Sequence, residues 1–111
     1  MPRDKDPTEA IREAAAAFDD VSSGTACNQT TFKVGKGGFL YIGPGPRGVG
    51  YKAMFRLGAS LADAEALAEE HPERFEIGRG GMVTARFSAE KPLAKRLWKK
   101  WLRESYLKAK K

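Results

Sequence analysis

Residues 30–57 read TTFKVGKGGFLYIGPGPRGVGYKAMFRL, and this stretch decides the fold. Three short runs rich in aromatic and β-branched residues, at 30–34, 39–42 and 50–57, are separated by two turns rich in glycine. Runs of this kind joined by short glycine turns are typical of an antiparallel meander. The stretch therefore predicts three consecutive strands that pair in sequence order.

The third of these runs alternates residue by residue. Its apolar set is Tyr51, Ala53, Phe55 and Leu57. Its other set is Lys52, Met54 and Arg56. Because successive side chains of a strand face opposite sides, the run predicts a sheet with one apolar face and one basic face. A fourth strand at 82–87 repeats the pattern, with Arg86 on the side opposite to its apolar residues.

Helices are predicted before and after these strands. The first begins at Pro7 behind an Asp6 cap, carries an apolar stripe at helical spacing, and is followed by a polar, irregular segment at 21–29. The second begins after the cap residue Ser60 and ends near His71, which precedes a proline.

The last predicted helix begins at Ser88 or Lys91, with Pro92 in its first turn. Its apolar stripe consists of Ala94, Leu97, Trp98, Trp101, Leu102 and Ser105. Because both tryptophans belong to this stripe, the pattern favours core packing for them over stacking on bases.

The order of elements is helix, three strands, helix, strand, helix, or α-β-β-β-α-β-α. This order predicts an α+β fold, in which an antiparallel sheet of four or five strands has helices packed on one face. At 111 residues the chain is expected to form one domain, 1–111. Residues 1–6 and 108–111 are expected to be frayed tails.

The composition indicates a soluble, cytoplasmic protein. It is 41% hydrophobic and 31% charged, and its one cysteine, Cys27, cannot form an internal disulfide. No apolar run approaches the roughly 18 residues of a membrane span. One Cys and one His cannot supply the four ligands of a zinc site, and no partner that would activate Cys27 is evident. We therefore expect no cofactor, no bound metal, no membrane partner and no enzymatic activity.

Charge is strongly segregated along the chain, whose net charge is +6. Residues 91–111 sum to +8, from nine Lys or Arg against Glu104, and residues 33–56 sum to +5. Residues 61–76 sum to −5, from six acids against Arg74. Clustered positive charge makes an attractive surface for phosphates, although an ordinary solubilising surface can have the same composition.

The segment Gly43-Pro-Gly-Pro-Arg-Gly48 has the spacing of a dinucleotide-binding loop. Such a loop needs a helix directly after its glycines, whereas a strand is predicted here. Pro44 and Pro46 also lack the N–H groups that would hold a pyrophosphate. We therefore interpret the segment as a hairpin turn with Arg47 at its tip.

Cations on the predicted sheet and on the last helix indicate a surface for nucleic acid. If the register follows the alternation, the outward sheet face carries Lys33, Lys52, Arg56 and Arg86. Turns at its rim add Lys36, Arg47 and Arg79. The last helix would extend the field with Lys95, Lys99, Lys100 and Arg103. Such a set suits a phosphate backbone, although outward charges also deter sheets from aggregating.

Several short motifs, taken in order, resemble the MmcQ/YjbR family over about residues 9–107. They are Thr31-Phe-Lys-Val-Gly-Lys36 followed by Phe39, Met54-Phe-Arg-Leu57, His71-Pro-Glu-Arg-Phe75, Gly80-Gly-Met-Val-Thr-Ala-Arg-Phe87 and Leu102-Arg-Glu-Ser-Tyr106. Many members carry a tryptophan where Met82 stands here. The resemblance implies a CyaY-like fold and DNA binding through a double-wing arrangement of hairpins. It implies no established activity, cofactor or catalytic residues.

The leading hypothesis is a small non-enzymatic nucleic-acid-binding domain with weak sequence specificity, and DNA is favoured over RNA. A second hypothesis is a protein–protein interaction or regulatory module that binds acidic partners, or that associates with itself through the acidic segment 61–76. A third is a domain that binds a small anionic ligand between sheet and helices. We favour a monomer.

Overall fold

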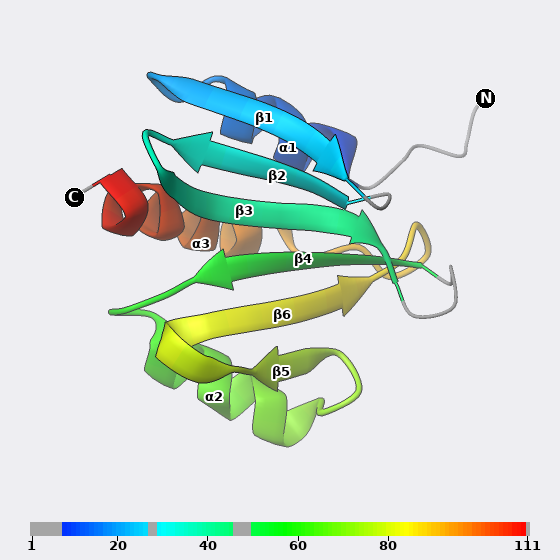
Figure 1. Ribbon diagram of the computed structural model, residues 1–111. Coiled ribbons are helices and arrows are strands. Elements are labelled where there is room, and N and C mark those ends of the chain that lie inside the picture. The colour runs from blue at the N-terminus through cyan, green and yellow to red at the C-terminus, as the bar shows by residue number, and fades with distance from the viewer. Residues whose placement is uncertain (1–7, 27–28, 46–49, 111) are drawn as a thin grey trace.

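The computed structural model describes residues 8–26, 29–45 and 50–110, which form one six-stranded sheet and three α-helices (Figure 1). The helices are α1 (Glu9–Ala16), α2 (Leu61–Glu70) and α3 (Lys95–Lys110). The strands are β1 (Val21–Ala26), β2 (Gln29–Val34), β3 (Gly37–Pro44), β4 (Tyr51–Arg56), β5 (Phe75–Ile77) and β6 (Met82–Phe87). A short 3₁₀ helix, η2 (Arg79–Gly81), joins β5 to β6.

The strands pair antiparallel throughout and lie in the order β1-β2-β3-β4-β6-β5. This order confirms the predicted α+β class and the meander formed by β2, β3 and β4. The sheet has six strands where the sequence predicted four or five. The additional strands lie at its two edges, and one of them, β5, is only three residues long.

The other edge strand, β1, occupies most of the segment 21–29, which the sequence wrongly predicted to be irregular. β1 reads VSSGTA and pairs with β2 from Val21↔Val34 to Ala26↔Gln29. Its core-facing side includes Ser23, which lies opposite Phe32. Because an edge strand buries few side chains, backbone pairing holds β1 in place without the apolar alternation that marks a central strand.

All three helices lie behind the sheet in Figure 1. α3 packs against β3 and β4, α1 packs against α3 and β1, and α2 packs against β5. This arrangement confirms the prediction that helices cover one face. In the core, Trp98 and Trp101 are 5% and 1% exposed, and Trp101 contacts Phe55 and Phe75 edge-on. The predicted burial of both tryptophans is confirmed.

A buried serine ties α3 to the middle of the sheet. Ser105 Oγ donates a hydrogen bond to the Phe39 carbonyl oxygen (2.5 Å) and accepts one from the Arg56 amide (2.9 Å). Phe39 lies at a β-bulge, and the pairing of β3 with β4 starts only at Leu40↔Phe55. Ser105 therefore satisfies two backbone groups that the strand pairing leaves free.

A side chain of α3 also caps α2. The sequence correctly placed Ser60 at the N-cap, but its side chain makes no capping hydrogen bond. Instead, Oε2 of Glu104 accepts hydrogen bonds from the amides of Gly58 (2.7 Å) and Ser60 (2.9 Å). Burial alone would raise the pKa of Glu104, but hydrogen bonds from Ser60 and Gly58 and the charge of Lys100 hold that pKa below its usual value.

The start of the last helix differs from the prediction. α3 begins at Lys95, and not at Ser88 or Lys91, because these two residues close a turn. The Ser88 amide donates to the Lys91 carbonyl oxygen (3.2 Å), and the Lys91 amide donates to Ser88 Oγ (3.0 Å). α3 then continues through residues 108–110, which the sequence assigned to a tail. Across residues 8–26, 29–45 and 50–110, none of the helices combines the length and apolar character needed to cross a membrane.

The first helix begins at Glu9, with Thr8 in the N-cap position. The predicted cap Asp6, the predicted first residue Pro7 and the expected frayed tail at 1–6 lie outside the described residues. The predicted apolar stripe of α1 faces the core, since Ile11 and Ala15 are buried there.

Candidate functional site

We call the side of the sheet that faces away from the helices the open face. The strand register identifies its residues: Tyr41 pairs with Met54, Met54 with Thr84, and Lys52 with Arg86. Paired residues of antiparallel strands point to the same side of a sheet. Since the neighbours of these residues along β4 and β6 are buried in the core, the paired side chains point away from the helices. The alternation in the sequence therefore predicted this face correctly.

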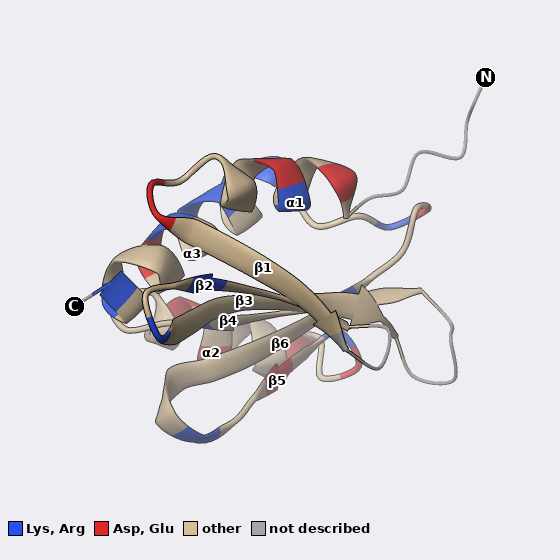
Figure 2. Cartoon of the chain, turned by 45° about the horizontal axis from the view of Figure 1, so that its top comes forward, with Lys and Arg blue, Asp and Glu red and all other residues tan. Residues whose placement is uncertain are grey.

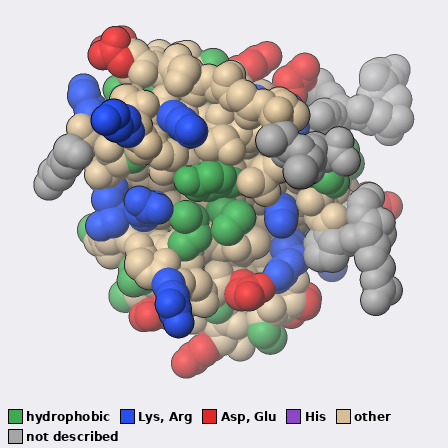
Figure 3. Space-filling view, in the orientation of Figure 1, with side chains coloured by type: hydrophobic (Ala, Val, Ile, Leu, Met, Phe, Trp, Pro, Cys, Tyr) green, Lys and Arg blue, Asp and Glu red, His purple; other side chains and the backbone are tan. Residues whose placement is uncertain are grey.

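The middle of the open face is apolar. Tyr41, Met54 and Met82 come from three adjacent strands, and each is half-buried. Figure 3 shows hydrophobic side chains gathered in the middle of this face, with Lys and Arg side chains around them. Apolar side chains that gather on one face of a sheet are one mark of an interaction site.

Tyr41 lies flat on the sheet. A Cβ atom built at Gly38 would collide with the Tyr41 hydroxyl and would lie 2.8 Å from its Cζ atom. The ring therefore covers the position where a side chain at Gly38 would stand, and only glycine leaves room for it. One side of the ring rests on β3, so the other side is directed to the open face.

Three of the predicted cations surround this apolar centre without an acidic partner. Lys52 and Arg56 precede and follow Met54 on the same side of β4, and both are half-buried. Lys33 lies on β2 opposite Gly38, and it is exposed. None of these three forms an ion pair with an acid among the described residues. Their charges are therefore available to a ligand.

The fourth predicted cation of the sheet is paired. Arg86 contacts Glu76 on β5 at 2.5 Å between Nη2 and Oε1. Glu76 lies opposite Thr84, so this carboxylate also belongs to the open face, and 63% of its side chain is exposed. The carboxylate of Glu76 offsets the charge of Arg86. The positive field of the open face is therefore concentrated over β2, β3 and β4.

The predicted rim cations lie in the connections between strands. Lys36 is exposed in the turn between β2 and β3, and Arg79 is exposed in η2 between β5 and β6. Arg47 lies outside the described residues. The turns can thus add positive charge at the same end of the sheet as Arg56, because the β2–β3 turn and η2 both lie beyond that end of β4.

The predicted cations of the last helix lie on the other side of the molecule. Lys95, Lys99, Lys100 and Arg103 are exposed on α3, behind the sheet (Figures 1 and 2). Lys100 also lies 3.7 Å from Asp63 of α2. Because the sheet and the core separate this group from the open face, a straight ligand cannot contact both groups together. The structure thus divides the predicted residues into two surfaces.

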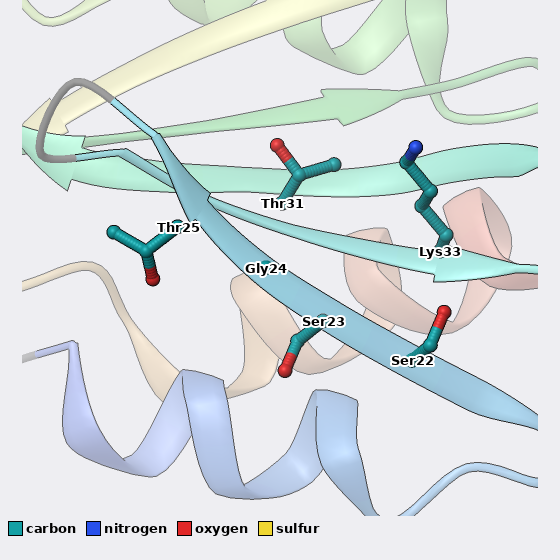
Figure 4. Close-up of a pocket in the computed structure, with 6 residues that line it drawn as sticks. All are labelled: Ser22, Ser23, Gly24, Thr25, Thr31 and Lys33. Carbon is teal, nitrogen blue, oxygen red and sulfur yellow. The ribbon is translucent and has the colours of Figure 1, made fainter.

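An open hollow of about 360 Å³ adjoins Lys33 at the β1 side of the sheet. It is lined by Ser22, Ser23, Gly24, Thr25, Thr31 and Lys33 (Figure 4). Thr31 and Lys33 point to the open face, whereas Ser23 and Thr25 point toward α1 (Figure 4). Apart from Gly24 itself and its two chain neighbours, no atom lies within 4 Å of a Cβ built at Gly24, so the missing side chain leaves this space. The sequence prediction missed the hollow because it did not predict β1.

The remaining sequence candidates lie between helices and strands or outside the described residues. β3 and β4 pair antiparallel, the Gly45 amide donates to the Gly50 carbonyl oxygen (3.0 Å), and the element after Gly50 is a strand, as predicted. His71 is exposed after α2 and lies 3.9 Å from Glu73. Cys27 lies outside the described residues, and within the described part no cluster of His, Cys, Asp and Glu could hold a metal ion.

The chain was compared with protein-family models, curated proteins and solved structures, and none of the three comparisons found a match. The resemblance to the MmcQ/YjbR family and the CyaY-like fold remain predictions from the sequence motifs.

Proposed function

We propose that this protein is a non-enzymatic, cytoplasmic nucleic-acid-binding protein, that DNA is its favoured ligand, and that the open face is its binding surface. The observation that carries the proposal is the set of unpaired cations Lys33, Lys52 and Arg56 around an apolar centre that no described helix covers. A sheet face that served only solubility would not need to combine these two features.

The spacing of the cations suits a polyanion. Four residues along a strand span roughly 13 Å, so Lys52 and Arg56 can contact phosphates that are more than one nucleotide apart. Lys36 and Arg79 add charge at the rim. Contacts with phosphates position a protein without reading bases, and weak sequence specificity follows from them.

Salt-dependent binding of labelled oligonucleotides tests this proposal. The five cations Lys33, Lys36, Lys52, Arg56 and Arg79 would give a slope of about −4 to −5 for log K against log salt on duplex DNA, at roughly −0.9 for each neutralised phosphate. Fluorescence anisotropy at several salt concentrations measures the slope. A protein that binds neither duplex nor single strands at ~50 mM salt would contradict the proposal, because electrostatic association is strongest there.

A second candidate function rests on the opposite side of the molecule. A hollow of about 400 Å³ between α1 and α3 has an apolar floor, which includes Phe18, Trp98 and Leu102, and Lys99 and Arg103 also line it. This combination suits the acidic, amphipathic segment of a protein partner. Binding of acidic peptides that oligonucleotides do not displace would support this second function. Loss of peptide binding in Arg103→Glu would place the peptide site in this hollow.

A further inference from the structure

We propose that the open face binds single-stranded nucleic acid, with one base stacked on the ring of Tyr41. This inference rests on the proposed function and deepens it, because it names the form of nucleic acid and the residue that contacts a base.

The position of the Tyr41 ring suits stacking on a base. Tyr41 lies over Gly38, so the sheet backbone supports one side of the ring and fixes its orientation. The other side faces away from the helices. A base has a π-face of similar size, and stacking of this kind does not depend on which base is present. The geometry thus fits the weak sequence specificity proposed above.

Two methionines extend the apolar surface beside the Tyr41 ring. Met54 lies directly opposite Tyr41 on β4, and Met82 lies on the next strand. Thioether side chains are flexible and make favourable contacts with aromatic rings. These two residues can therefore support a second, neighbouring base. In a duplex the bases are stacked inside, so the open face would contact only the sugar–phosphate backbone of the nucleic acid. The apolar centre would then contact no base.

Three cations lie around the apolar centre. Lys33 lies beside the ring, and Lys52 and Arg56 lie on either side of Met54. Phosphates of a strand whose bases lie on the apolar centre would reach these cations. This pattern of cations around an aromatic platform matches a polyanion with bases, whereas an apolar protein partner would have to bury three unpaired charges.

The two ends of the open face limit which strands of the sheet a bound nucleic acid covers. Glu76 is the last residue of the row that runs from Thr31 through Tyr41 to β5, and its carboxylate occupies the guanidinium of Arg86, so this end offers phosphates no unpaired cation on the strands. At the other end, the hollow at Gly24 offers the hydroxyl of Thr31 and the amine of Lys33 to a phosphate or a sugar (Figure 4). A bound strand would therefore extend from β1 across β4 to Met82 of β6 and stop short of β5.

The test compares Tyr41→Leu with Tyr41→Phe and with the wild-type protein. Each is titrated with labelled oligothymidine, oligouridine and duplex DNA over a range of salt concentrations, and thermal unfolding establishes that each variant is folded. We expect Tyr41→Leu to bind both single strands roughly ten-fold or more weakly at every salt concentration, with the salt slope unchanged, because stacking is lost and no phosphate contact is. Tyr41→Phe should stay within about three-fold of the wild type.

The outcomes separate this inference from the proposed function. Equal affinity of Tyr41→Leu and the wild type for single strands, with salt-dependent binding retained, would overturn the stacking and leave the nucleic-acid function intact. Absence of binding by the wild type to all three oligonucleotides would overturn both. Stronger binding of oligouridine or of oligothymidine would identify the RNA or the DNA source.

A second measurement on the wild-type protein does not depend on the folding of a variant. A single strand that contains 4-thiouracil is crosslinked by light, and mass spectrometry identifies the modified residues. We expect crosslinks at Tyr41 and Met54. Crosslinks confined to α3 would contradict the inference.

Discussion

Both sides of the molecule carry exposed or half-buried cations, but these cations lie in different surroundings. On the open face, Lys52 and Arg56 flank the half-buried side chain of Met54, and within the described residues neither of their side chains forms an ion pair. On the other side, the polar residues of α3 include Ser105 and Glu104, which bond to the sheet and cap α2. Net charge alone cannot distinguish a binding surface from a helix that holds the fold together; the partners of each side chain can.

The largest expected effect is on nucleic-acid affinity, when charge reversal on the open face is compared with charge reversal on α3. We expect Lys52→Glu with Arg56→Glu to weaken nucleic-acid binding roughly 100-fold at low salt and to flatten the salt slope, because each reversal removes a phosphate contact and adds a repulsion. The matched control, Lys99→Glu with Arg103→Glu, should change affinity by less than about three-fold. Anisotropy titrations measure both. Equal losses in the two double variants would contradict the separation of the two sides.

The next effect concerns stability and belongs to α3. Ser105→Ala leaves the Phe39 carbonyl and the Arg56 amide without their partner, so the free energy of unfolding should fall by about 2 kcal/mol. Urea unfolding measures this change. Lys33→Gln on the open face is the control and should stay within about 0.5 kcal/mol of the wild type. A Ser105→Ala protein as stable as the wild type would show that α3 does not support the sheet in this way.

A smaller stability effect depends on pH. Because the pKa of Glu104 is lowered in the folded protein, its ionised form stabilises the fold above the usual pKa of about 4.5, and this contribution is lost as the pH falls through the folded-state pKa. Glu104→Gln should therefore lower the free energy of unfolding by about 1 kcal/mol at pH 7. The difference from the wild type should shrink as the pH falls below about 4.5 and through the lowered pKa of the folded state. A difference in the free energy of unfolding between the two proteins that stays constant across this pH range would contradict the capping role.

The smallest expected effect is a gain on the open face. Glu76→Gln removes the carboxylate that pairs with Arg86, so nucleic-acid affinity should rise two- to five-fold and the salt slope should steepen by roughly 1. The control Glu73→Gln, outside the strands, should leave the slope unchanged. A decrease in affinity in Glu76→Gln would show that Glu76 positions Arg86 for binding. This outcome would contradict the inference that a bound strand avoids β5.

Much of the fold follows from local patterns in the sequence. The alternation in β4 and β6 fixed which residues face the helices, and the stripe of α3 predicted the burial of Trp98 and Trp101. These elements are central, so burial imposes its period on the sequence. β1 was missed because an edge strand with few buried side chains carries no such period.

The features that the sequence could not supply depend on contacts between distant residues. Glu104 caps a helix that begins 43 positions earlier, at Leu61, and nothing in the local sequence of α2 indicates that its cap comes from α3. The support of Tyr41 by Gly38 is local, but it requires the bulge at Phe39, which places two adjacent residues, Phe39 and Leu40, in the core and breaks the alternation of β3. Similarly, the division of the cations between two sides required the position of α3.

The most direct measurement is an amide chemical-shift map of the ¹⁵N-labelled protein titrated with a short single-stranded oligonucleotide. The central claim predicts that the largest shifts lie on the open face, at Lys33, Tyr41, Lys52, Met54 and Arg56, and that residues 95–110 change little. Large shifts confined to α3 and its neighbours, with the strands unaffected, would contradict the claim and assign binding to the opposite side of the molecule.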